Sequence, residues 1–135
     1  MSESANQFIK RRSEAFQKNL KKYNNNPKDC YLKWLPDINR IGQYGFIREA
    51  WTFMSQFNTK EKLFIIERFK RVKIQKPITN KKLKIGETEY RFGYYMVGKN
   101  GNRKNKWTWG ESCPIIPKED FDKLIKKAKQ EKTIL

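Results

Sequence analysis

The sequence predicts an α+β fold with a helical N-terminal half, a three-stranded antiparallel β-meander and a C-terminal helix packed on the sheet. Three patterns support this prediction: apolar residues recur with helical spacing in residues 4–23, alternate with period two in 88–98, and return to helical spacing in 118–132. A chain of 135 residues with 37% hydrophobic content can form one modest core. We therefore expect a basic amphipathic N-terminal helix or arm over residues 1–26 and a single α+β domain over 27–135.

The helix predicted over residues 4–23 has two unlike faces. At about 100° per residue, one sector holds the apolar side chains of Ala5, Phe8, Ile9, Phe16, Leu20 and Tyr23. The opposite side holds the cations Lys10, Arg11, Lys18, Lys21 and Lys22. Pro27 ends the helix, because the residue before a proline is disfavoured in the helical region. The cationic face is interpreted as the solvated face of a packed helix, as a phosphate-binding face or, more weakly because the apolar stripe lacks tryptophan, as a membrane-surface face.

Two further helices are predicted in the middle of the chain, over residues 44–56 and 60–72. The second starts with a capping pair, Asn58 and Glu61, and its central apolar run would wrap most of the helix circumference, so we expect it to be buried. A buried strand is the alternative for this run. The connection that follows contains Pro77 and is expected at the surface. Its candidate phosphate-binding cations are Lys70, Arg71, Lys73, Lys81, Lys82 and Lys84.

The pattern then changes to period two, which predicts an antiparallel meander. Its strands are residues 83–85, 88–98 and 106–110, joined by a tight turn at Gly86 and a polar loop at 99–105. The long strand is expected to place on the core face Tyr90, Phe92, Tyr94 and Met96. The helix over residues 118–132 covers that face with an apolar stripe of Phe121, Leu124, Ile125 and Ala128.

The chain carries 31 lysines and arginines against 14 acids, a formal charge of +17. A charge of this size concerns partners rather than fold, and it favours a polyanion. The cations are segregated, because residues 60–84 hold ten bases and two acids whereas residues 34–59 hold two of each. The neutral segment is also the richest in large apolar side chains, so we expect it to contribute most to the core.

A basic and aromatic hairpin over residues 90–109 is the strongest indication of function. Cations follow the phosphates of a nucleic acid, and flat side chains stack on unpaired bases for roughly 1 to 3 kcal/mol each. The candidate cations of the hairpin are Arg91, Lys99, Arg103, Lys104 and Lys106. Its candidate stacking residues are Tyr95, Trp107 and Trp109, because a three-stranded meander usually has only one covered face. Core packing is the alternative for these three aromatic residues.

Enzymatic activity is not expected. The chain has no histidine and no glycine-rich phosphate loop, so acid-base chemistry would fall to carboxylates, lysine or tyrosine. A small metal-dependent nuclease built on Glu87 and Glu89 is a minor alternative. We expect no catalytic residue, no metal ion and no cofactor.

These observations predict a non-catalytic protein that binds nucleic acid, either DNA or RNA, as an accessory or regulatory component of a larger nucleic-acid machine or ribonucleoprotein assembly. The main alternative is a basic protein-binding module or inhibitor that targets an acidic protein surface. Two isolated cysteines, Cys30 and Cys113, and the lack of an apolar leader or membrane-spanning stretch predict a soluble intracellular protein, in the cytoplasm, the nucleoid or the nucleus.

Overall fold

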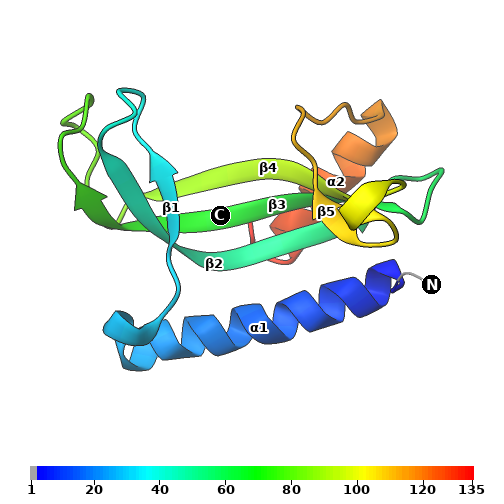
Figure 1. The fold of residues 1–135 in the computed structure, drawn as a ribbon, viewed down its shortest axis with the longest axis horizontal. Coiled ribbons are helices and arrows are strands. Elements are labelled where there is room, and N and C mark those ends of the chain that lie inside the picture. Colours follow the sequence, from blue (N-terminus) through cyan, green and yellow to red (C-terminus); the bar gives the residue numbers. More distant parts are fainter. Residues whose placement is uncertain (1–2) are drawn as a thin grey trace.

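A five-stranded antiparallel sheet forms the centre of the fold (Figure 1). The computed structural model describes residues 3–135, and within this range each strand pairs with the next one along the chain. The strands are β1 Lys33–Pro36, β2 Gln43–Ser55, β3 Lys62–Gln75, β4 Thr88–Val97 and β5 Trp107–Trp109. The helices are α1 Ala5–Asn25 and α2 Lys118–Gln130, with short 3-10 helices at Pro27–Asp29 and Gly101–Arg103.

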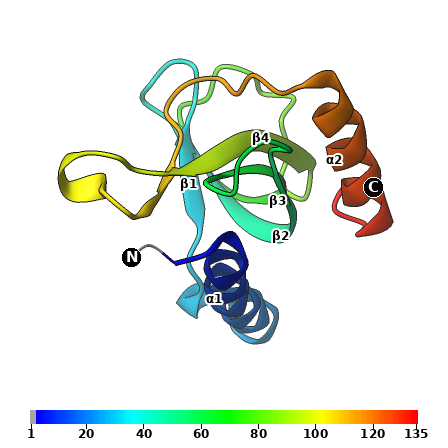
Figure 2. The same ribbon diagram turned by 90° about the vertical axis from the view of Figure 1, so that its right-hand side faces the viewer.

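The two helices lie on opposite faces of the curled sheet, as the end-on view in Figure 2 shows. Successive strand residues point to opposite faces, so β3 supplies both cores. Leu63 and Ile65 pack in the core under α1, whereas Phe64 and Ile66 pack in the core under α2. All four side chains are at most 4% exposed, and each contributes about 1.5 to 3 kcal/mol by leaving water.

The helices predicted over residues 44–56 and 60–72 are wrong, because β2 and β3 occupy these segments. The apolar run in β3 is continuous since both faces of the strand are covered, and such a run lacks the periodicity that separates a buried strand from a buried helix. The alternative of a buried strand is confirmed. Residues 83–85, predicted as a strand, lie in the irregular connection between β3 and β4. The sheet therefore has five strands instead of three, and the N-terminal half holds β1, β2 and the start of β3 besides α1. An α+β fold with a C-terminal helix on the sheet is confirmed.

The remaining predicted elements, α1, β4, β5 and α2, end within two residues of their expected limits. A capping box starts α1, because the Ser4 hydroxyl accepts a hydrogen bond from the Gln7 N–H and the Gln7 side chain accepts one from the Ser4 N–H. Phe8 and Phe16 on the inner face of α1 are buried, and the Phe16 ring stacks on Trp51 at 4.7 Å between centroids. The helix is thus packed on the sheet along its length.

A buried carboxylate joins the turn after β1 to the connection between β3 and β4. Asp37, 6% exposed, accepts hydrogen bonds from the Tyr44 hydroxyl at 2.6 Å and from the Thr79 hydroxyl and N–H at 2.6 and 3.0 Å. These bonds, led by that of the Thr79 hydroxyl, hold the pKa of Asp37 well below its usual range. The ionised carboxylate is therefore part of the folded state.

Acidification is expected to remove this contribution. Because the folded pKa is depressed, Asp37 stabilises the fold above its unfolded pKa of about 4, and the contribution is lost as the pH falls through the folded pKa. Asp37→Asn should lower the urea midpoint at neutral pH. The difference in free energy of unfolding between the variant and the wild type should decrease between about pH 4 and about pH 2. Asp122→Asn, which removes an exposed ion pair with Lys118, is the control, and its free energy of unfolding should stay close to that of the wild type at every pH. If the difference between Asp37→Asn and the wild type stays constant with pH, the ionised Asp37 does not stabilise the fold as described.

Candidate nucleic-acid interface

Four cations meet in a cavity between α1, β1 and the sheet face that α1 covers; we name it the basic cavity. Its volume is about 280 Å³. The lining residues are Arg12 of α1, Tyr31 just before β1, Lys33 of β1, Arg48 of β2, Arg91 and Tyr95 of β4, and Trp109 of β5. Segments from both halves of the chain therefore build one site. Arg91, Tyr95 and Trp109 were candidates from the sequence, and the other four were not.

Glu67 of β3 holds two of the arginines. Its side chain is fully buried, and its carboxylate accepts hydrogen bonds from Arg48 Nε and Arg91 Nε, each at 2.7 Å. The register explains the contact, because Glu67 lies directly opposite Arg91 on the neighbouring strand β4. A buried carboxylate is costly unless it is paired, so Glu67 requires these two cations close by.

Aromatic rings support the same two guanidinium groups. Cζ of Arg91 lies 4.5 Å from the centroid of Trp109, and Cζ of Arg48 lies 4.8 Å from that of Trp51. Trp109 can approach the sheet because residue 93 is glycine: a Cβ on Gly93 would be 2.3 Å from the indole. Each cation–π contact contributes about 0.5 to 2 kcal/mol. Both arginines are therefore fixed before any ligand binds.

Arg12 and Lys33 complete the cavity, and neither has a carboxylate partner within residues 3–135. Arg12 Nη2 donates to the Tyr95 hydroxyl at 3.3 Å, whereas Arg12 Nε is buried and has no hydrogen-bond partner among the described residues. Glu67 is the single carboxylate bound to the lining arginines in this part of the chain, so the cavity has an excess of three positive charges. Such an excess in a partly enclosed space favours an anion.

Asn19 fixes the segment that leads into β1. Its side-chain amide donates to the Tyr31 carbonyl at 2.9 Å, and its side-chain oxygen accepts the Tyr31 N–H at 2.6 Å. Asn19 follows Arg12 by seven residues, about two helical turns, so both lie on the same side of α1. The Tyr31 side chain is nevertheless 66% exposed. An exposed ring on a fixed backbone beside a cationic cavity is suited to stack on a base.

The cationic face predicted for the N-terminal helix lies in solvent. Lys10, Lys18, Lys21 and Lys22 are exposed, and Arg11 pairs with Glu3 at 2.6 Å. Within α1 the six cations are accompanied by one acid, Glu14. The helix α1 thus carries this face and, through Arg12, one of the residues that line the basic cavity.

The cations around the β3–β4 connection have different environments. Lys73, Lys81, Lys82 and Lys84 are exposed, and Lys70 is half-buried over the Tyr23 ring. Arg71 is only 1% exposed, pairs with Glu87 and Glu89, and stacks against Tyr44. We therefore leave Arg71 out of the interface, since its charge is neutralised inside the protein.

The loop between β4 and β5 presents fewer free cations than its sequence indicates. Lys99 pairs with Glu61, and Arg103 pairs with Glu111 at 3.0 Å, whereas Lys104 and Lys106 are exposed. This loop and the β3–β4 connection flank opposite ends of β4, whose ten residues span roughly 33 Å. The two basic loops therefore do not form one site.

The sheet face that was expected to be open is covered by α1. The Phe8 ring stacks on Trp107 and tilts against Tyr95, at 5.3 and 5.0 Å between centroids, and Tyr95 is 8% exposed. Tyr95 is therefore buried and Trp107 half-buried, because the meander has a helix on each face. Trp109 keeps a surface in the basic cavity. The exposed aromatics and methionine of β4 are instead those predicted as core, namely Tyr90, Phe92 and Met96.

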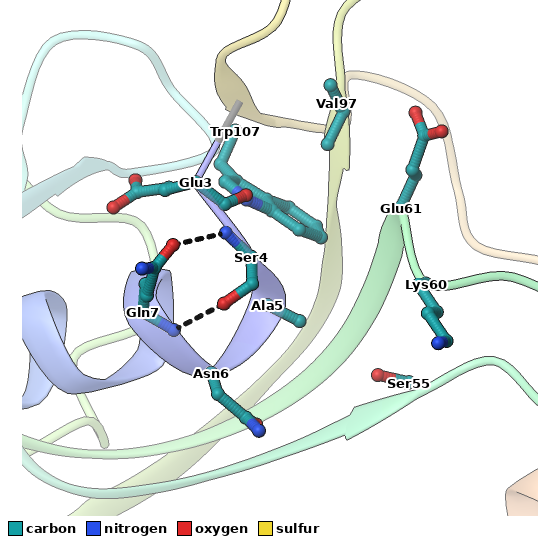
Figure 3. Close-up of a pocket in the computed structure, with 10 residues that line it drawn as sticks. All are labelled: Glu3, Ser4, Ala5, Asn6, Gln7, Ser55, Lys60, Glu61, Val97 and Trp107. Atoms are coloured by element: carbon teal, nitrogen blue, oxygen red, sulfur yellow. Dashed lines mark hydrogen bonds between the residues drawn. The ribbon is translucent and has the colours of Figure 1, made fainter. Parts of the chain in front are cut away.

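A larger cavity, of about 720 Å³, lies at the N-terminus of α1 and is less suited to an anion (Figure 3). The carboxylates of Glu3 and Glu61 line it, and the capping box drawn as dashed lines engages the N–H groups of Ser4 and Gln7. Lys60 also lines this cavity, and both carboxylates are already paired, Glu3 with Arg11 and Glu61 with Lys99. The cavity therefore lacks the excess of cations found in the basic cavity, and two N–H groups at the start of α1 are already bonded, which disfavours a phosphate there.

One signal for the basic cavity was present in the sequence. Counted at about 100° per residue, Arg12 and Asn19 fall inside the apolar sector of α1 rather than on its cationic face. A charged residue inside an apolar stripe requires a polar environment within the fold. Tyr31 and Lys33 gave no such signal, because their position depends on the contact between Asn19 and the chain before β1.

Comparisons with known proteins add no assignment. No protein-family model matches the chain, and no curated protein and no solved structure matches it significantly. In residues 3–135, no cluster of three or more Cys, Asp or Glu side chains is arranged to hold a metal ion. No helix in that range is both long and apolar enough to cross a membrane.

Loss of the Glu67 charge should destabilise the fold. Glu67→Gln would leave two guanidinium groups under α1 without a counter-charge, at a cost of about 3 kcal/mol, the lower end for buried pairs because the arginines stay partly hydrated. Glu111→Gln, in the exposed pair with Arg103, should cost about 1 kcal/mol or less. Chemical denaturation measures both values. Equal small losses would show that Glu67 does not organise the cavity.

Proposed function

We propose that this protein binds nucleic acid without catalysing a reaction on it. The observation that carries the proposal is the solvated lysine face of α1 together with the basic cavity, which Arg12 of the same helix helps to line and beside which a tyrosine is exposed. Cations bind phosphates, and an exposed ring binds an unpaired base.

The lysines of α1 support phosphate contact because they are free. Among the described residues, Lys10, Lys18, Lys21 and Lys22 make no ion pair with a carboxylate. Each phosphate contact made by such a side chain releases condensed counterions, which favours binding at low salt. A lysine that is already paired would first have to exchange its partner.

Two buried carboxylates support a non-catalytic role because both oxygens of each accept hydrogen bonds. One oxygen of Glu67 accepts from Arg48 and the other from Arg91. One oxygen of Asp37 accepts from the Tyr44 hydroxyl and the other from the Thr79 hydroxyl. A general base must accept a proton from the substrate, and these oxygens are already held by groups of the protein.

Removal of the α1 lysines should weaken binding without unfolding the protein. The triple substitution Lys18→Gln, Lys21→Gln and Lys22→Gln should lower the salt slope for a single-stranded oligonucleotide by about two, since each phosphate contact contributes about 0.7. The melting temperature should change little, because surface substitutions usually alter stability by about 0.5 kcal/mol or less. Fluorescence anisotropy at several salt concentrations measures the slope.

A matched triple variant on α2 controls for net charge. Lys123→Gln, Lys126→Gln and Lys129→Gln remove the same three charges from the opposite face of the sheet, and the salt slope should stay close to that of the wild type. Equal slopes for the two triple variants would show that α1 is not the phosphate-binding face. A wild-type affinity that does not depend on salt would remove the proposal altogether.

Tyr31 should contribute by stacking rather than by charge. Tyr31→Ala is expected to weaken binding of a single strand by about 1 to 3 kcal/mol and to leave the salt slope unchanged. Phe57→Ala is the control, because Phe57 is 72% exposed in the connection between β2 and β3 and should be neutral. If Tyr31→Ala binds the single strand as tightly as Phe57→Ala does, Tyr31 does not contact a base.

A further inference from the structure

We infer that the basic cavity binds a phosphate monoester, supplied by the phosphorylated end of a nucleic-acid strand. The inference rests on the proposed function for the source of the phosphate, whereas its chemistry rests on the cavity alone. The cavity and the exposed lysine face of α1 would then have separate tasks. The lysines follow the backbone, and the cavity receives the end of the strand.

The available donors in the cavity suit a phosphate. Arg91 gives its Nε to Glu67, and no hydrogen bond from its two Nη groups is present within residues 3–135. Arg12 has a buried Nε without a partner in the same range, and Lys33 has no carboxylate partner there. Guanidinium and ammonium groups that converge in excess over carboxylates are the usual donors to phosphate oxygens.

The charge of the cavity favours a monoester over a diester. A phosphate monoester carries a charge of about −1.5 to −2 at neutral pH, whereas a phosphate inside a strand carries one negative charge. The excess of three positive charges therefore attracts a terminal phosphate more strongly than an internal one. An internal phosphate would leave more of this charge uncompensated.

The shape of the cavity also favours an end. Residues of the sheet strands β1, β2, β4 and β5 line it together with Arg12 of α1 and Tyr31 before β1, so it lies where α1 meets the sheet. A volume of about 280 Å³ accommodates a phosphate with its sugar and not a duplex. Tyr31, which lines the cavity with its ring exposed, would meet the terminal base.

The experiment compares three versions of one short single strand, labelled internally, that carry a 5′-phosphate, a 3′-phosphate or hydroxyl groups at both ends. For the wild-type protein, one phosphorylated end should bind about tenfold more tightly than the hydroxyl strand, as expected for a charge-assisted hydrogen-bonded phosphate. The end that shows the gain identifies the strand polarity. Equal affinities for all three strands would overturn the inference and leave the proposed function intact.

Two variants test whether the gain belongs to the cavity. The double variant Arg12→Gln and Lys33→Gln leaves Glu67 with both of its arginines, and it should bind all three strands alike. The double variant Lys126→Gln and Lys129→Gln on α2 removes the same charge and should keep the tenfold preference. A preference that survives in the cavity variant would overturn the assignment. Lys33→Gln alone is the fallback if the double variant does not fold, with circular dichroism as the check.

A separate titration distinguishes failure of the inference from failure of the proposed function. If none of the strands binds, the proposed function fails, and calorimetry with a nucleoside monophosphate against the unphosphorylated nucleoside decides the inference. Binding of the monophosphate alone, lost in Lys33→Gln, would retain the cavity as a phosphate-monoester site for a free nucleotide. Absence of binding would overturn it.

Discussion

The α1 side of the sheet is organised around one buried carboxylate, Glu67. A carboxylate without solvent contact is stable in its ionised form only beside cations, so the central strand determines that Arg48 and Arg91 lie on this face. Such an ion pair adds little net stability compared with apolar packing, and its main effect is to specify an arrangement. Here the arrangement brings positive charge to a place where a sheet face covered by a helix would ordinarily continue its apolar core.

The inner face of α1 also has an apolar part and a polar part. Phe8 and Phe16 pack in apolar surroundings, whereas Arg12 and Asn19 lie on the same side of the helix and make polar contacts with the sheet and with the chain before β1. One helix face therefore both closes the core and forms a wall of the basic cavity. Phe8 and Arg12 both contact Tyr95, so the apolar and cationic parts are joined through that residue.

The sequence pattern predicted the helices and strands that have one apolar and one polar face. It did not predict the strand whose two faces are both apolar. The helices α1 and α2 and the strand β4 alternate between apolar and polar residues with a clear period, so their positions followed from the sequence. In β3 both faces are covered, and the continuous run of Leu63 to Ile66 removed the period that would have shown a strand. The burial of Tyr95 was not evident from the sequence for a related reason, because the number of covered sheet faces depends on where α1 packs. Arg12 was detectable as a charge within an apolar stripe, whereas Lys33 reaches the cavity only through tertiary contacts.

The wide separation of the cavity residues along the chain has a consequence for biosynthesis. Arg12 and Trp109 lie 97 positions apart, so the cavity cannot form until the chain has been made past Trp109 and α1 has docked. Before that moment the chain is already strongly basic and attracts polyanions in a loose, indiscriminate way. Ligand selectivity in this protein would therefore appear only at the completion of folding. A nascent chain and a folded molecule would both attract a polyanion, and only the folded molecule would prefer a particular part of it.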